Sequence, residues 1–448
     1  MIPAQHLRLG LVPLARTTFD IPLANQVAAQ VRLQLHDAGF QLAGSEALVT
    51  DLEQTQAVAR KLARQPLDLL VILQATFADS TMVMGLAEVV EAPLLLWAVP
   101  EERRGGRLQL NSFCGINLGA HALRRGGYAY EYVYAPPQDP KALDKIHALA
   151  VAGRARRLLR QARLGRIGEH PDGLDSCKLD ETALARRFGL DVVQVELADV
   201  FEAAERADVH QVDSLEQDLM RRLDGVQELD QAALHRTLGS YLALRQLAEE
   251  EHLAGLAVRC WPEFFTELGC AACGAMSMLS DELTPCSCEA DVNGTVTQLM
   301  LQWLSGGAAF GTDVVSFDLE EDVAVVWHCG LAPLSMADPA VHPRATIHSN
   351  RKLPLLMEFP LKPGRVTIAR LSEATGSYRL VVSRGEMLRA PMSFTGTSGT
   401  LRFDRPAAKV LDTLLSEGLE HHVSLTYGDY VPALLALAKM LDLPVLRL

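Results

Sequence analysis

Short, unbroken apolar runs alternate with segments of helical spacing through the first part of the chain. Leu67–Leu73 (Leu-Asp-Leu-Leu-Val-Ile-Leu) and Pro93–Val99 are two such runs, of strand length rather than helix length. A strand that is apolar throughout is typical of a parallel sheet, because helices cover both of its faces. The alternation therefore predicts a doubly wound α/β domain. Ligands bind beyond the carboxyl ends of such strands, where the loops Gln74–Asp79 and Pro100–Gly106 lie.

The same alternation restarts after Ala135–Pro140, a proline-rich segment that we interpret as a domain edge. Leu164–Gly168 and Gly255–Cys260 read as strands, with helical segments between them. After residue 310, short strands and turns dominate, which indicates an antiparallel β-barrel. We predict two doubly wound Rossmann-like α/β domains followed by a C-terminal antiparallel β-barrel domain with closing helices, with the boundaries 1–150, 151–310 and 311–448.

The charge balance excludes several classes of partner. Lys and Arg number 42 against 55 Asp and Glu, giving a net charge of −13. An acidic chain is poorly suited to a nucleic-acid backbone or an anionic membrane surface. No apolar stretch approaches the ~20 residues of a membrane helix, and Met1–His6 does not begin a secretory signal. We expect a cytoplasmic location and a small-molecule substrate.

Six of the eight cysteines lie between residues 260 and 329. We expect reduced thiols rather than a disulfide framework in a chain of this size. Cys270, Cys273, Cys286 and Cys288 could hold a structural zinc ion, but their spacing departs from two C-x-x-C knuckles and the intervening segment reads as a helix. Packing of these side chains as small buried apolar groups is the favoured interpretation.

Carboxylates follow two neighbouring strands of the second predicted sheet. Glu263 comes after a Trp-Pro corner, and Glu289 and Asp291 precede a helical run. Adjacent parallel strands would bring Glu263 and Asp291 together, and two close carboxylates need a cation or a shared proton. Manganese or magnesium suits oxygen ligands. The alternative, that each carboxylate caps a helix or pairs with an arginine, has equal weight on the residues alone.

A nitrogen ligand could come from His421-His422. Neighbouring side chains of a strand point to opposite faces, so we expect only one of the pair to face the site. A hydrogen-bonded histidine with no metal is the ordinary alternative. His328 ends another β-run, and Glu169 and His170 occupy a polar loop at a strand end. Phosphate-binding loops and a nucleophile elbow are absent from the sequence.

Three stretches together resemble the L-fucose/L-arabinose isomerase superfamily, in its fucose isomerase-like branch. They are Cys260-Trp-Pro-Glu-Phe-Phe265, Cys288-Glu-Ala-Asp-Val-Asn-Gly294 and His421-His-Val-Ser-Leu-Thr-Tyr-Gly-Asp429. Trp327-His-Cys-Gly330 resembles members of the wider group. The family fold is two α/β domains and a C-terminal β-barrel, and its members are homo-trimers or homo-hexamers.

The resemblance implies a metal-dependent aldose–ketose sugar isomerase. Manganese, or another divalent ion such as Mg²⁺ or Co²⁺, would be held by Glu263, Asp291 and His422 and would chelate the substrate's O1 and O2. Glu263 and Asp291 would move protons through an enediolate. The expected substrate contacts are Trp261, Asn293, His328 and Glu169.

Three alternatives remain open on the sequence. One is a non-catalytic sugar-binding or regulatory protein on the same scaffold. Another is an unrelated enzyme with a structural zinc in the cysteine cluster. The last is an isomerase of a modified, for example acidic, sugar, for which the basic loop Arg103-Arg104 would be suited.

Overall fold

The computed structural model describes residues 2–103 and 105–448, which form two compact units. One unit comprises residues 2–157 with 435–442, and the other comprises residues 158–434 with 443–448. Among the described residues, no helix has both the length and the apolar character needed to cross a bilayer.

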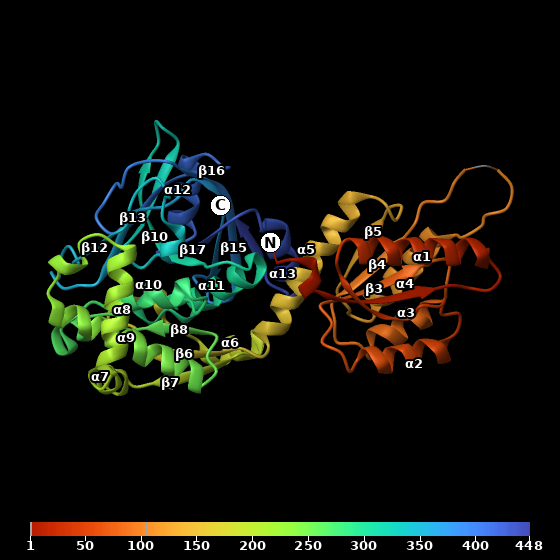
Figure 1. Ribbon diagram of the computed structural model, residues 1–448. Coiled ribbons are helices and arrows are strands. Elements are labelled where there is room, and N and C mark those ends of the chain that lie inside the picture. Colours follow the sequence, from red (N-terminus) through yellow and green to blue (C-terminus); the bar gives the residue numbers. More distant parts are fainter. Residues whose placement is uncertain (1, 104) are drawn as a thin grey trace. The chain divides into compact units, whose positions relative to one another are not determined.

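The first unit contains a five-stranded parallel sheet in the order β2-β1-β3-β4-β5 (Figure 1, red to yellow). This order places helices on both faces and confirms the predicted doubly wound pattern. The predicted strand Leu67–Leu73 is β3, which is buried along its whole length. The strands are β1 Arg8–Leu14, β2 Gln41–Gly44, β3 Leu69–Gln74, β4 Leu94–Ala98 and β5 Tyr130–Tyr134. The helices are α1 Ile21–Asp37, α2 Leu52–Leu62, α3 Ser80–Ala87, α4 Ser112–Arg125 and α5 Pro140–Leu159.

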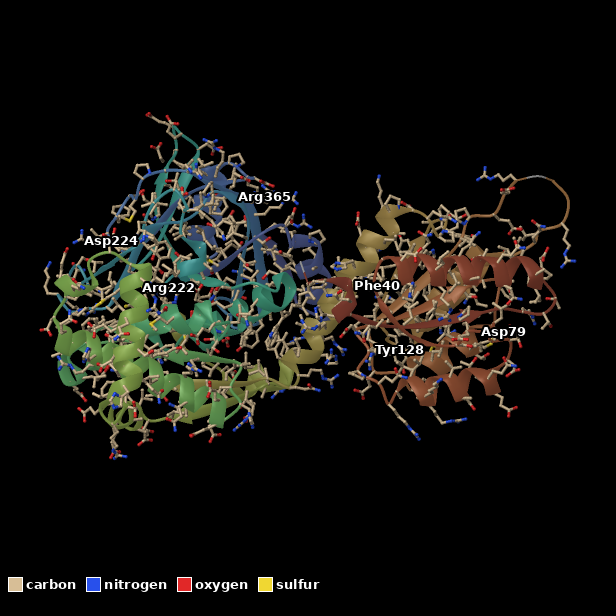
Figure 2. The ribbon with its side chains drawn as sticks, in the orientation of Figure 1. Phe40, Asp79, Tyr128, Arg222, Asp224 and Arg365 are labelled. Atoms are coloured by element: carbon tan, nitrogen blue, oxygen red, sulfur yellow. A yellow bond between two sulfur atoms is a disulfide. The ribbon has the colours of Figure 1, made fainter. Side chains whose placement is uncertain are left out.

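The loop after β3 illustrates how this sheet edge is built. Asp79, labelled in Figure 2, is the N-cap residue of α3, but its side chain makes no capping hydrogen bond. Its carboxylate instead faces Arg16 Nη1 at 3.7 Å.

The C-terminal segment of the same unit contacts β5. Lys439 pairs with Glu131 and donates to the Tyr130 carbonyl at 2.9 Å.

The second unit begins with a four-stranded parallel sheet in the order β7-β6-β8-β9. Its strands are β6 Arg163–Ile167, β7 Asp191–Val195, β8 Gly255–Val258 and β9 Cys286–Ser287. Its helices are α6 Glu181–Phe188, α7 Leu197–Glu205, α8 Val209–Arg222, α9 Gln231–Glu250, α10 Cys273–Asp281 and α11 Val292–Ser305. Nearly every residue of α11 is buried, because this helix packs on β8 and also on strands of the barrel.

The barrel is closed by six strands, β16-β11-β10-β17-β14-β15, because β15 also pairs with β16. All six pairings are antiparallel, as predicted (Figure 1, teal to blue). These strands are β10 Phe310–Asp318, β11 Val323–His328, β14 Gly364–Ser372, β15 Arg379–Leu388, β16 Thr397–Phe403 and β17 His422–Tyr427. Accessory elements are β12 Arg344–Thr346, β13 Leu356–Pro360, β18 Val445–Arg447 and α12 Ala407–Ser416. Helix α13, Val431–Met440, begins in this unit, and its residues from 435 onward belong to the first unit.

One hydrophobic core joins the central sheet to the barrel. It includes Leu256 of β8, Leu279 of α10, Ile368 of β14 and Leu425 of β17. This shared core explains why the sheet and the barrel fall in a single compact unit. Helix α11 packs directly on β14 and β17 of the barrel. The division at 1–150, 151–310 and 311–448 stays a prediction.

Candidate active site

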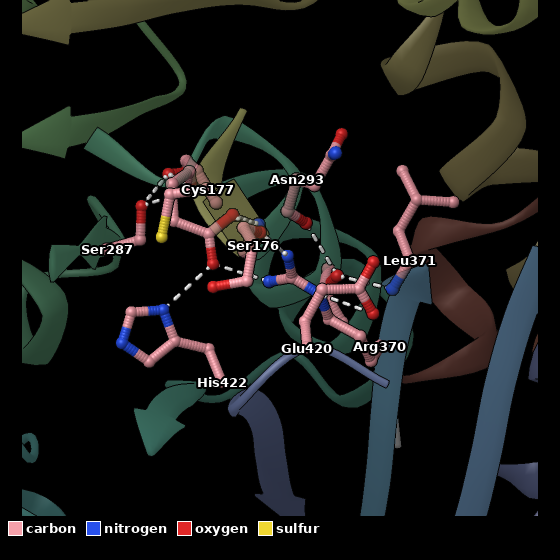
Figure 3. A network of polar contacts seen from close by, with 12 residues as sticks. Ser176, Cys177, Ser287, Asn293, Arg370, Leu371, Glu420 and His422 are labelled. Atoms are coloured by element: carbon pink, nitrogen blue, oxygen red, sulfur yellow. Dashed lines mark hydrogen bonds and ion pairs between the residues drawn. The ribbon is translucent and has the colours of Figure 1, made fainter. Parts of the chain in front are cut away.

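Asp291 lies at the N-terminus of α11 and is fully engaged there. Figure 3 labels two of its partners, Arg370 and His422. Its Oδ1 accepts the Gly294 backbone N–H at 2.8 Å, which caps the helix. Both carboxylate oxygens accept from the Arg370 guanidinium of β14, one of them at 3.1 Å, and Oδ2 lies 3.0 Å from His422 Nδ1. Burial raises the pKa of Asp291, but the Arg370 charge and the His422 hydrogen bond outweigh it and hold that pKa well below its usual range. Asp291 is therefore a buried, ionised and fully partnered carboxylate.

Glu289 has different partners although it is only two residues away. Glu289 and Ala290 both adopt left-handed backbone conformations, with φ of 60° and 54°. Glu289 Oε1 accepts from Trp261 Nε1 at 3.1 Å, and Oε2 lies 3.2 Å from His421 Nε2. Burial raises the pKa of Glu289, whereas His421, His422 and Trp261 together bring it below its ordinary value. An ionised carboxylate thus faces the two histidines.

Each of the two histidines is held through Nδ1. Ser176 Oγ lies 2.8 Å from His421 Nδ1, and Asp291 fills the same role for His422. Both rings therefore direct Nε2 toward Glu289 Oε2, at 3.2 Å from His421 and 3.9 Å from His422. The expectation that only one of the pair faces the site is wrong. Strand β17 begins at His422, so the alternation of a strand does not apply to His421.

This group of side chains fits a divalent cation. The donor atoms of Cys177, Glu289, His421 and His422 all lie within 4.8 Å of one another, and these four residues are called the cluster below. His422 Nε2 is also 3.7 Å from Asp313 Oδ1, a buried atom without a hydrogen-bond partner among the described residues. Two ligands about 2.1 Å from one ion lie roughly 3.0 to 3.5 Å apart, close to the spacings seen here. Oxygen and imidazole nitrogen suit manganese, whereas burial raises the pKa of the Cys177 thiol and so disfavours a thiolate ligand.

Glu263 is engaged with Arg259 rather than with Asp291. Arg259 Nε and Nη2 donate to the two Glu263 oxygens at 2.8 and 2.7 Å, and this hydrogen bonding lowers the pKa of Glu263. Within residues 2–103 and 105–448, no hydrogen bond or ion pair joins Glu263 to Asp291. Arg259 Nη1 also donates to the backbone carbonyls of Glu169 and His170, while the Glu169 carboxylate pairs with Arg166. The expected ligand Glu263 and the expected substrate residue Glu169 therefore gather around Arg259.

The other expected substrate residues lie at different places around the cluster. Trp261 contacts it directly through Glu289. His328, at the end of β11, is buried, and its ring stacks at 5.9 Å from that of His422. Asn293, in the first turn of α11, is buried and donates to Glu373 at 3.4 Å.

The cysteines correct one expectation and confirm another. Cys260 and Cys288 form a disulfide, against the prediction of reduced thiols throughout. This bond joins the residue before Trp261 to the residue before Glu289. Cys273 Sγ lies 3.3 Å from Cys329 Sγ, and Cys286 is a buried free thiol, so the four cysteines considered for zinc do not converge. Cys270, Cys273 and Cys286 are buried free thiols, as favoured on the sequence, whereas Cys288 is oxidised.

A separate cavity of about 350 Å³ lies in the first unit, at the carboxyl ends of β4 and β5. Residues 101–103, 105 and 106 of the predicted pocket loop Pro100–Gly106 line it, and Arg107 follows them. Glu101 organises the loop by accepting three consecutive backbone N–H groups, from Gln109 to Asn111. Arg104 lies outside the described residues.

Four residues in or next to the cluster were missed by sequence reasoning or were given no role. Glu289 was visible beside Asp291, but its left-handed turn was not. Arg370 interrupts the apolar run Ile368–Leu371 within β14, and this is the signal that could have identified it. Asp313 and Cys177 carry no such signal, because only the tertiary fold brings them to His422 and Glu289.

Comparison with known proteins decides the family. A model of the fucose/sulfoquinovose isomerase N-terminal domain matches residues 10–157, and one of the L-fucose isomerase C-terminal domain matches residues 357–448. The sulfoquinovose isomerase of Alkalicoccus urumqiensis is 32% identical over 442 residues, covering 98% of each chain. The chain belongs to the fucose/sulfoquinovose isomerase family. A second family member, the sulfoquinovose isomerase of Priestia aryabhattai, is 30% identical over 98% of both chains. Membership confirms the resemblance read from the three motifs and makes the chain an aldose–ketose isomerase.

The similarity to a solved structure of a sugar-binding protein is remote. A periplasmic solute-binding protein of an ABC transporter from Actinobacillus succinogenes, with bound D-allose, aligns at 10% identity and a TM-score of 0.18. It covers 66% of this chain and 91% of that one. A likeness of this size supports no inference about fold or ligand.

Proposed function

We propose that this isomerase converts sulfoquinovose, a hexose with a sulfonate on C6, to the corresponding ketose with the help of a divalent cation. The sulfoquinovose isomerases that match over the full chain support the substrate. The observation that supports metal binding is the convergence of Glu289 Oε2 with Nε2 of His421 and of His422. Manganese is the favoured ion, with Mg²⁺ or Co²⁺ as substitutes.

Glu289, His421 and His422 would hold the ion in this proposal, and Asp291 would position His422. A carboxylate that accepts from one ring nitrogen of a metal-binding histidine fixes its tautomer and orientation. Asp291 has this relation to His422 Nδ1, and Arg370 keeps it ionised. Its oxygens are already engaged by Gly294, Arg370 and His422, so we assign it the positioning role instead of direct ligation. When bound, the cation would polarise the substrate carbonyl as a Lewis acid.

Glu263 is the proposed base for proton transfer between C2 and C1. It lies two residues beyond Trp261, which donates to Glu289. Its pairing with Arg259 keeps the carboxylate ionised at neutral pH, the form that accepts a proton. The family pattern also supports a homo-trimer or homo-hexamer, which light scattering on the purified protein would identify.

The test is hydrogen exchange at C2 of the sugar. Metal-stripped protein would be incubated in deuterated water with sulfoquinovose, L-fucose or D-glucose, with and without manganese, and exchange followed by NMR. We expect manganese-dependent exchange with sulfoquinovose. Glu289→Gln should lose both manganese binding and exchange, whereas Glu263→Gln should bind manganese and lose exchange.

Glu417→Gln is a matched control, because Glu417 pairs with Arg379 on the barrel and has no place in the cluster. It should retain both properties. Manganese-dependent exchange that persists in Glu289→Gln would overturn the metal assignment. Full activity in Glu263→Gln would overturn the assignment of the base.

A further inference from the structure

Arg351 is held by neighbouring aromatic side chains close to the proposed metal ligand Glu289. It lies in the loop between β12 and β13 and is exposed. Its guanidinium carbon stacks 4.9 Å from the Trp261 ring centre and 5.0 Å from that of Phe265. Nη1 lies 3.4 Å from Nε2 of His348, a buried residue whose ring packs edge-on against Phe265 at 5.3 Å. Three rings therefore fix the guanidinium in place.

This guanidinium differs from the other arginines near the site in having no carboxylate. Arg166, Arg259 and Arg370 pair with Glu169, Glu263 and Asp291, respectively. Among the described residues, Arg351 forms no ion pair. Stacking on aromatic rings uses the face of a guanidinium and leaves its in-plane N–H groups able to bind an anion in a bidentate manner.

Trp261 connects this cation to the reacting end of the site. The indole stacks under Arg351 and donates Nε1–H to Glu289 Oε1 at 3.1 Å. The positive charge thus lies one indole ring away from the carboxylate proposed as a metal ligand. A sugar that places C1 and C2 at Glu289 and extends along the indole would bring its far end to Arg351.

We propose that Arg351 is the specificity-determining residue that binds the anionic group of the substrate at the end opposite C1 and C2. This inference rests on the proposed function and extends it, because it explains how this site distinguishes a sulfonated hexose from a neutral one. The sulfonate offers three acceptor oxygens to the in-plane guanidinium donors, whereas the neutral sugars offer only a hydroxyl group (D-glucose) or a methyl group (L-fucose) there.

The test compares Arg351→Met, Arg351→Lys and Lys352→Met in the manganese-loaded enzyme. Lys352 is the matched control, because it is the adjacent exposed cation and no aromatic stacking is found for it among the described residues. We expect Arg351→Met to lower kcat/KM for sulfoquinovose roughly 10- to 100-fold, the range of a hydrogen bond to a charged group. The loss should fall in KM, with kcat and manganese content unchanged. Arg351→Lys should recover part of it, and Lys352→Met should change KM less than about threefold.

Calorimetric binding of sulfoquinovose gives the same comparison without turnover. Binding without isomerisation that weakens in Arg351→Met would support Arg351 and refute the proposed reaction. Isomerisation with an unchanged KM in Arg351→Met would refute the role of Arg351 and leave the reaction intact. The role is also refuted by equal losses in Arg351→Met and Lys352→Met, by a preference of the wild type for L-fucose or D-glucose, or by no binding of sulfoquinovose.

Discussion

Two neighbouring regions of the site use charged side chains in opposite ways. Around Asp291, burial is complete and every charge has a partner, since Arg370 and His422 occupy its oxygens. Around Glu289, the carboxylate faces histidine nitrogens at spacings that leave room for an ion, and the side chain of His421 is 41% exposed. The comparison indicates that the first region fixes geometry and the second binds ligands, although only two residues of chain separate their carboxylates.

The sharpest test of this contrast is Glu289→Gln. We expect manganese affinity to fall by more than about 100-fold, beyond the range typical of residues that only support a ligand. The free energy of unfolding should fall by about 1 kcal/mol, because the amide oxygen can still accept from Trp261 whereas the charged contact with His421 is lost. Manganese titration and urea unfolding of the metal-free protein measure the two quantities. A large loss of stability with unchanged affinity would reverse the roles of the two regions.

Arg370→Met should show the opposite pattern. Removing one partner of a buried ion pair typically costs about 3–5 kcal/mol, since the remaining charge has no compensation. Urea unfolding of the metal-free protein should show this loss. In the double variant with Asp291→Asn part of the stability should return, because the carboxylate that binds Arg370 most closely is then neutral. The recovery should be incomplete, because Glu420 also loses Arg370 as its partner. A loss below ~1 kcal/mol in the single variant would contradict the role given to this pair.

Asp291→Asn separates a positioning residue from a ligand. If Asp291 acts through His422, manganese affinity should fall about 10- to 100-fold, as for other carboxylates that orient a metal-binding histidine. Calorimetric titration with manganese measures this, with Glu289→Gln as the reference. A loss as large as that of Glu289→Gln would make Asp291 a direct ligand, as the family pattern implies.

The smallest effect is expected on the outer surface of the barrel. Arg365, labelled in Figure 2, pairs with Asp404, and this hydrogen bonding lowers the pKa of Asp404. A lowered carboxyl pKa stabilises the fold at neutral pH, and that contribution disappears as pH falls through the folded-state pKa, below the ordinary value of 3.8. Because Asp404 is 40% exposed, Asp404→Asn should cost less than about 1 kcal/mol at pH 7, with unchanged activity. Thermal unfolding should show a smaller difference between wild type and variant at pH 3 than at pH 7.

The sequence was sufficient for the architecture and for part of the site. Apolar strands and the change of texture near residue 310 predicted the parallel sheets and the barrel, because both patterns follow from which faces are buried. The motifs identified Trp261, Asp291 and His422, all of which lie in or against the cluster. Arg259 as the partner of Glu263 could not be predicted, because such pairings depend on side-chain directions at loop ends. Glu289 was misjudged because its left-handed turn could not be seen in the sequence. His421 was misjudged because strand β17 begins only at His422.

The left-handed pair Glu289-Ala290 also limits which sequences can diverge at this site. Side chains branched at Cβ strongly disfavour such φ values, so few substitutions at these two positions would preserve the turn. The loop that carries Arg351 has no comparable restriction at that residue. Its neighbour Lys352 does share the left-handed conformation, with φ of 61°. New substrate preferences within the family would therefore arise more readily by exchanging Arg351 than by altering the turn, so that the residues proposed for the reaction stay constant while substrate preference changes.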